Sequence, residues 1–215
     1  MIISRIKGLF LSTFVPLTIC LFALAVFPPI SHADDQAEAQ HYAPVKEKAY
    51  EGIPGRLRYN VHIVLIEEDK HGNIVPRKDS SSLTRHQLAA TVMAAALYYA
   101  EAKNADVVGV TLESQPGPAF GKSPLATVTY APDGKGVSGS DNWTWDMLQA
   151  TPRGLTAQEL KIQRLWGEMR GQFQANGFTD EERLKAAIAK KLKIPVEKVM
   201  LYPVFLEPFQ PERTN

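Results

Sequence analysis

The clearest period-two pattern of the chain lies at residues 57–65, where apolar and polar residues alternate. Such alternation predicts a strand with one buried face, and it places His62 on the more polar face. The apolar positions of this strand are Leu57, Tyr59, Val61, Ile63 and Leu65. The other segments with strand character are 105–114, 123–133, 143–146 and 198–209. Because Pro203 cannot donate a backbone hydrogen bond, the last strand is expected at an edge of the sheet.

A first helix is predicted to begin after Thr84. Gln87, three residues further on, completes a capping box, and Leu83 and Leu88 stand at the spacing of a hydrophobic staple. The helix body that follows is rich in alanine and apolar on most sides. A helix of this kind is stable only when it is buried against a sheet or other helices, so we expect it at the centre of the core.

Two more helices are predicted in the C-terminal third of the chain. Asn176-Gly177 is expected to end the first of them. The last helix has acidic residues at its start and lysines near its end, which complements the helix macrodipole. The capping boxes of the two helices are Thr156 with Glu159 and Thr179 with Glu182.

The elements follow the order β-α-β-β-(β)-α-α-β. This order predicts a single α+β domain over residues 57–209, with a small, mostly antiparallel sheet and helices packed on one face. Residues 34–56 are polar and show no periodic apolar face, which predicts a polar linker or an extended arm. Residues 210–215 are expected to form a polar tail.

Residues 1–33 have the pattern of a secretory signal peptide. Arg5 and Lys7 precede an apolar run over residues 9–27, and small residues stand at the positions that a signal peptidase reads. We therefore expect cleavage between Ala33 and Asp34. The alternative is an uncleaved membrane anchor, since the apolar run is close to the roughly 20 residues that span a bilayer.

Cysteine content and charge narrow the class of protein. Cys20 is the only cysteine and lies in the leader, so the mature chain forms no disulfide, which suits an oxidising compartment. The bulky Ile19 before it argues against lipidation. Without Arg5 and Lys7, the 24 basic residues fall to 22, against 23 acidic ones. Such a near-neutral chain argues against a nucleic-acid partner.

The segment GPAFGKS at 117–123 looks like a nucleotide-binding loop but lacks its geometry. Its two glycines enclose three residues, whereas a P-loop needs four. Pro118 also removes one of the N–H groups that would point at a phosphate. The following residues, LATVTY, have the character of a strand and not of a helix. We therefore expect no nucleotide here, but a loop that connects two strands.

Residues 130–146 are the most distinctive stretch of the chain, and two interpretations of it are open. In the first, the two indole rings share one face of an extended segment and form the platform of a ligand or peptide groove. In the second, a tight hairpin places the tryptophans over the end of the core. The candidate ligand or partner residues are Tyr130, Asp133, Lys135, Asp141, Trp143 and Trp145.

The sequence shows no signature of metal binding or of covalent catalysis. Neither H-x-x-x-H nor H-E-x-x-H occurs, and the acidic residues of 130–146 do not match EF-hand spacing. G-x-S-x-G is also absent. We expect no metal and no cofactor, and the sequence indicates no catalytic residue. A Ser–His–Asp set that folding assembles, with His86 and Asp133, stays open.

Several segments together resemble a bacterial domain family of unknown function. Similar proteins are often carried on plasmids, prophages and integrative elements. The resemblance covers about residues 57–209, and it implies no known activity and no catalytic residues. A glycine-rich step at 137–139 departs from the family pattern, which has a bulkier residue there. The segments are LTRHQLAATVMAAALYYA, ADVVGVTL, LATVTYAPDGKG and the W-x-W pair, of which YAPDGKG at 130–136 is the most specific.

These patterns predict an exported, non-enzymatic interaction protein, periplasmic or secreted, whose partner is another envelope protein or a peptide. A flat apolar patch rimmed by polar residues would favour this prediction. One alternative is a hydrolase with a non-contiguous site near residues 115–146, which a deep pocket with convergent polar groups would favour. Another is a membrane-tethered accessory subunit of an envelope machine. It would touch the membrane only through an uncleaved leader.

Overall fold

The computed structural model describes residues 37–117, 124–201 and 206–208. The predicted signal peptide with its cleavage site between Ala33 and Asp34 lies outside these residues, as do most of the GPAFGKS loop, Pro203 and the tail at 210–215. Across the described ranges, no helix is both long enough and apolar enough to cross a membrane.

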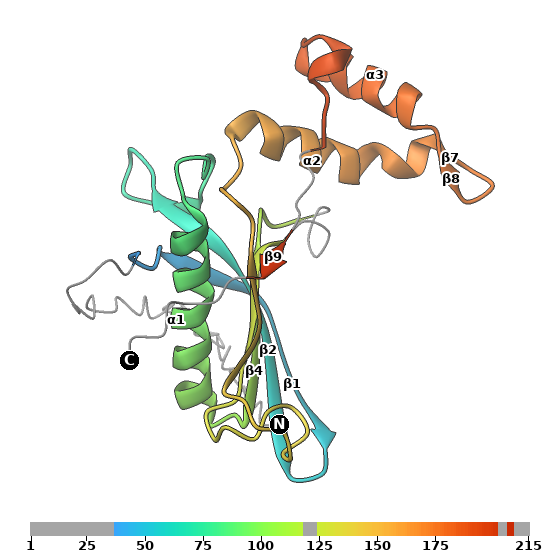
Figure 1. The fold of residues 1–215 in the computed structure, drawn as a ribbon. Coiled ribbons are helices and arrows are strands. Elements are labelled where there is room, and N and C mark those ends of the chain that lie inside the picture. The colour runs from blue at the N-terminus through green and yellow to red at the C-terminus, as the bar shows by residue number, and fades with distance from the viewer. Residues whose placement is uncertain (1–36, 118–123, 202–205, 209–215) are drawn as a thin grey trace, which may run out of the picture. The chain divides into compact units, whose positions relative to one another are not determined.

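A mixed sheet forms the centre of the described chain (Figure 1). Its strands are β1 (Tyr42–Ile53), β2 (Arg56–Glu68), β3 (Ile74–Pro76), β4 (Val107–Glu113), β5 (Pro124–Tyr130), β6 (Trp145–Ala150) and β9 (Glu207–Pro208). They lie in the order β1-β2-β4-β5-β6-β9, and β3 pairs with β2. Strands β2 and β4 run parallel, and the other described pairs are antiparallel. The prediction of a mostly antiparallel sheet is confirmed.

Residues 34–56 were predicted as a polar linker or an extended arm, and strand β1 shows that residues 42–53 of this segment belong to the sheet. It pairs antiparallel with β2, from Tyr42 opposite Leu65 to Ile53 opposite Arg56. β1 is an edge strand, and most of its side chains are exposed on both faces. Its sequence therefore has no period-two apolar pattern, because this strand is held by backbone pairing and not by burial of one face.

Helix α1 (Arg85–Lys103) lies along one face of the sheet and connects its β2–β3 part to β4 (Figure 1). As predicted, the Thr84 side chain accepts a hydrogen bond from the N–H of Gln87, and the Gln87 side chain accepts one from the N–H of Thr84. Leu83 and Leu88 are both buried. This helix crossover is what allows β2 and β4 to run parallel.

The main core lies between α1 and the sheet. Along each strand, alternate residues face α1, because successive side chains of a strand point to opposite faces. The prediction that the first helix is a central core element is confirmed. The largest buried side chains of this core include Val61, Ile63, Leu88, Val92, Leu112, Leu125 and Leu155.

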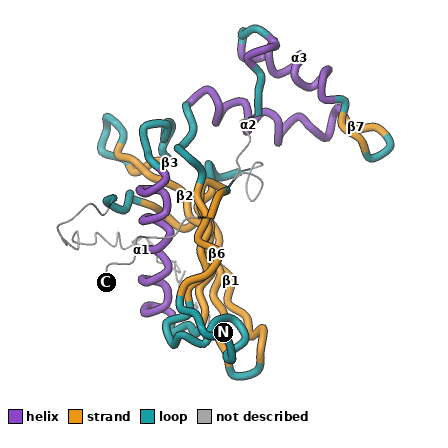
Figure 2. The backbone as a smooth tube through the Cα atoms, in the orientation of Figure 1, coloured by secondary structure: helices purple, strands orange, loops and turns teal. Residues whose placement is uncertain are grey.

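Helices α2 (Ala157–Met169) and α3 (Glu181–Leu192) pack against each other around a second hydrophobic cluster. The hairpin β7 (Gln174–Ala175)–β8 (Phe178–Thr179) and 3-10 turns at 170–173 and 196–198 complete this part (Figure 2). We call residues 157–201 the helical module. The buried members of the second cluster are Ile162, Leu165, Leu184, Ile188, Ala189 and Val199.

Two details of the helical module correct the sequence predictions. Asn176-Gly177 does not end α2 but forms the two-residue turn of the β7–β8 hairpin, and both residues have positive φ, as such turns require. Asp180, and not Thr179, caps α3, because its side chain accepts the hydrogen bond from the N–H of Arg183. Thr179 is instead the last residue of β8.

The start of α2 is tied to the main core. The predicted capping box of Thr156 with Glu159 is present, and Leu155 and Leu160 belong to the main core and not to the second cluster. A carboxylate oxygen of Asp79 accepts a hydrogen bond from the N–H of the first residue of α2 at 3.0 Å. The described chain is therefore a single α+β domain, as predicted.

Candidate functional site

Asp133, in the YAPDGKG segment, binds Arg56 at the start of β2. Nη1 and Nη2 of Arg56 donate to the two carboxylate oxygens at 2.7 and 3.2 Å, and Nη2 also donates to the Gly136 carbonyl at 2.8 Å. The hydrogen bond from Arg56, followed by that from the backbone N–H of Lys135, lowers the pKa of Asp133 to about 2. The arrangement is a clamp that holds the 131–144 loop against β2.

The same loop is closed internally at Gly136. This residue has a φ of 59°, and a Cβ placed on it would lie 2.5 Å from Asp141 and 2.6 Å from the Trp143 ring, so only glycine fits. Asp141 accepts a hydrogen bond from the N–H of Ser138 at 3.0 Å. Lys135 forms an isolated bridge with Trp143. The charged residues of the predicted site therefore all take part in the structure of the loop.

The aromatic residues of the predicted site are divided between strand and loop. Tyr130 pairs with Trp145 between β5 and β6, and their ring centroids lie 4.2 Å apart. Both side chains are partly buried against the main core. Trp143 precedes β6 and is half-buried beside Gly136. These contacts favour the interpretation in which the aromatic residues cover the end of the core.

Asp133 and His86 were the residues named for a Ser–His–Asp set. Both carboxylate oxygens of Asp133 are engaged by Arg56, and His86 lies in the first turn of α1. The expected connecting loop at 117–123 lies outside the described residues except for Gly117. Within the described ranges, no three His, Cys, Asp or Glu side chains come close enough together to hold a metal ion.

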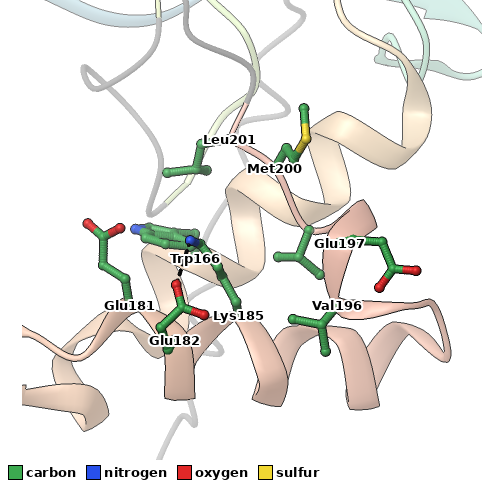
Figure 3. A pocket seen from close by; sticks show the side chains of 9 residues that line it. Trp166, Glu181, Glu182, Lys185, Val196, Glu197, Met200 and Leu201 are labelled. Carbon is green, nitrogen blue, oxygen red and sulfur yellow. Dashed lines mark hydrogen bonds and ion pairs between the residues drawn. The ribbon is translucent and has the colours of Figure 1, made fainter.

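A groove of about 690 Å³ lies in the helical module, between α2, the start of α3 and residues 196–201 (Figure 3). Three of its lining side chains are apolar and exposed to solvent, namely Val196 (42 %), Met200 (65 %) and Leu201 (40 %). They lie beside the half-buried indole of Trp166. An exposed group of large apolar side chains of this kind marks a surface that binds another molecule.

The charged side chains of the groove are mainly acidic. Glu181 and Glu182 stand in the first turn of α3, where they also complement the helix dipole, and Glu197 stands in the 3-10 turn after it. Among the described residues of the lining, the one cation is Lys185, which forms an ion pair with Glu182 at 3.0 Å (Figure 3). The three carboxylates and one ammonium of these described residues give a net charge of −2.

The sequence does not indicate this groove, for two reasons. The spacing of Trp166 fits the apolar stripe of α2, and this stripe predicts burial. Met200 and Leu201 belong to the segment 198–209, predicted as a strand, but the described residues of that segment form a strand only at Glu207–Pro208. The available signal was the run of apolar residues at 199–201, which follows α3 and Pro195.

Comparison with solved structures finds a close relative. A crystal structure of a DUF487 family protein from Desulfovibrio piger is 75% identical to this chain, with a TM-score of 0.78. The similarity covers 81% of this chain and 97% of that chain. A comparison with curated proteins finds no match.

Comparison with family models gives the family. The model described as "Domain of unknown function (DUF4875)" matches residues 38–204. This range begins before β1 and ends after the helical module, so it includes strands β1 to β6 of the sheet, α1 and the groove. The expectation of an uncharacterised domain family is thereby confirmed. Because the match covers well over half of its length, the chain belongs to the DUF4875 family.

Proposed function

We propose that this chain is an exported protein that binds another protein or a peptide of the cell envelope through the groove of the helical module. The observation that carries the proposal is the exposure of Val196, Met200 and Leu201 beside Trp166. Apolar side chains enclosed by a charged rim are the usual anatomy of a protein-binding site. The proposal retains the interaction class expected from the sequence but moves the binding surface from residues 130–146 to the helical module.

The lining also indicates the chemistry of the partner. A segment that fits would place apolar side chains, aromatic or aliphatic, against Trp166 and Met200, because burial of these groups supplies the affinity. The net charge of −2 on the lining favours lysine or arginine beside those apolar side chains. We therefore expect a partner segment that combines apolar anchors with basic residues.

Photo-cross-linking in cells tests the proposal. A photoreactive residue at position 200 should form an adduct with one envelope protein, whereas the same residue at position 178 should not. Phe178 is a matched control, because it is exposed (80 %) and belongs to the β7–β8 hairpin of the same module but does not line the groove. Adducts of equal yield at both positions, or none at position 200, would contradict the proposal.

The partner identified in this way allows a quantitative test. Leu201→Glu adds a fourth carboxylate to the described lining and removes an apolar contact, so we expect it to weaken binding by about tenfold or more in calorimetry. Phe178→Ser should change the affinity by less than about twofold. Both positions are exposed, so both variants should fold.

Export is tested separately from binding. Arg5, Lys7 and the apolar run that follows support a signal peptide, and the expected mature protein begins at Asp34. N-terminal sequencing of the protein from an envelope fraction measures this directly. An intact Met1 on the envelope form would contradict cleavage and would favour the membrane-tethered alternative.

A further inference from the structure

The face of the sheet opposite α1 presents ordered rows of side chains. Residues that pair across neighbouring strands share one face. His62, Thr111 and Thr127 therefore form one row across β2, β4 and β5, because each is in register with the next. The next row contains Asn60, Gly109 and Thr129. Main-core residues such as Val61 and Val110 alternate with these rows and point the other way, towards α1.

A hollow of about 290 Å³ lies over these rows. Gly109, on the middle strand, belongs to the lining of the hollow. The Asn60 side chain lies over Gly109, since a Cβ on Gly109 would lie 2.7 Å from Asn60 Oδ1. The remaining polar lining consists of Arg58, His62 and three threonines, which are Thr111, Thr127 and Thr129. Hydroxyl and amide groups from three adjacent strands thus line one shallow site, and Arg58 belongs to the same lining.

Basic side chains lie on the β1 side of this face. Lys46, Lys48 and Tyr50 of β1 are in register with His62, Asn60 and Arg58, so they extend the same face. Glu113 and Asp146 are carboxylates of this face. Glu113 is buried, with its side chain 1% exposed, and its Oε1 lies 2.8 Å from Nδ1 of His62, which fixes the orientation of the imidazole at the hollow. Asp146 of β6 pairs with Thr129, so it lies at the end of this face that is farther from β1.

Arg58 is the residue best placed to bind a ligand. Its guanidinium carbon lies 5.4 Å from the centre of the Tyr50 ring, so an aromatic face supports the guanidinium. Its Nε is buried and has no hydrogen-bond partner within the described residues. A guanidinium that is supported in this way presents the fork of N–H groups that binds carboxylate or phosphate oxygens.

We infer that this face of the sheet is a binding site for a small anionic ligand that carries a carboxylate or phosphate group. Arg58 binds the anionic oxygens, and Asn60 and the threonine hydroxyls bind the rest of its polar groups. The size of the hollow suits one small molecule. Of the described residues that line it, none is phenylalanine, tyrosine or tryptophan, so the hollow lacks the large aromatic platform on which single-stranded nucleic acid stacks.

Titration of the ¹⁵N-labelled protein with inorganic phosphate, and separately with acetate, tests the inference by NMR. At least one of the two anions should cause saturable chemical-shift changes in the amides of β2, β4 and β5. Shifts with phosphate alone identify a phosphate ligand, and shifts with acetate alone identify a carboxylate. An absence of saturable shifts with both anions, or shifts confined to the helical module, would overturn the inference.

Variants locate the binding. Arg58→Gln should weaken the binding of the active anion by about tenfold or more, because it removes the charge-assisted hydrogen bonds. Arg164→Gln is the matched control, since Arg164 is an exposed arginine of α2, outside this face, and should change binding less than about twofold. Thr129→Val serves as a second test if Arg58→Gln does not fold, with weakening of about threefold or more expected. Unchanged binding in the folded Arg58 variant, or in Thr129→Val, would overturn the inference.

Discussion

At the scale of the residue, the contact between Arg56 and Asp133 leads to a prediction of stability. Asp133→Asn retains the size of the side chain but removes the charge that Arg56 contacts at 2.7 Å. A hydrogen bond to a charged group contributes about 1.5–3 kcal/mol. The Asp133 side chain is 31% exposed, so screening by solvent reduces the expected loss to about 1 kcal/mol. Urea denaturation measures this loss, and Lys135→Ala in the same loop is the control, with a change within about 0.5 kcal/mol.

The same contact predicts how stability depends on pH. Arg56, and after it the N–H of Lys135, lowers the pKa of Asp133 from 3.8 to about 2. A carboxyl group whose pKa is lower in the folded state stabilises the fold above its unfolded pKa, and this contribution is lost as the pH falls through the folded value. The stability difference between wild type and Asp133→Asn should therefore be constant above about pH 5 and shrink towards zero near pH 2. A difference that stays the same down to pH 2 would contradict the clamp.

At the scale of the element, α1 offers a test of burial with an internal control. Ala95 is fully buried in the main core, so Ala95→Asp places a carboxylate without a partner there, at a cost of roughly 3–5 kcal/mol. Leu97, on the same helix, is 47% exposed, and Leu97→Asp should cost less than about 1 kcal/mol. Equal melting temperatures for the two variants would show that α1 does not face the core in this way.

Two tryptophans provide a second comparison at this scale. Trp145 is the first residue of β6, and Trp143 lies two positions before it. Trp145 contacts the Tyr130 ring and packs against the main core, so we expect Trp145→Ala to lower the free energy of unfolding by more than about 2 kcal/mol. Trp143 packs on the loop at Gly136, and its replacement by Ala should cost less. If both variants keep wild-type stability in urea, the tryptophans do not cover the core, and the platform interpretation of residues 130–146 has to be tested.

The elements also show why part of the fold and of the candidate site could be predicted from the sequence. The capping boxes at Thr84 and Thr156 act within one turn, so the starts of α1 and α2 could be predicted directly. β1 has no buried face, and Asp133 meets Arg56 across 77 residues, so local sequence marks neither feature. The groove depends on how residues 196–201 pack against α2, which is a tertiary property.

At the scale of the whole described chain, hydrophobic side chains form two clusters of unequal size. The main core contains the residues between α1 and the sheet, and the smaller cluster lies in the helical module. Leu155 and Leu160 belong to the main core, so the start of α2 is held by it, whereas α3 contributes to the smaller cluster alone. Proteins open in cooperative units of different stability. We therefore expect the helical module to open at a lower free energy than α1 and the sheet.

Native-state hydrogen exchange tests this expectation. Ile188 is fully buried in the smaller cluster, and truncation of such a side chain to alanine costs about 2–5 kcal/mol. Ile188→Ala should therefore speed exchange in α3 and the C-terminal half of α2, while α1 and β4 keep their protection. Val92→Ala, in the main core, is the control, and it should speed exchange in α1, the sheet and the start of α2, because the start of α2 depends on that core. If Ile188→Ala speeds exchange equally in α1 and α3, the two clusters open together and the helical module is not a separate unit.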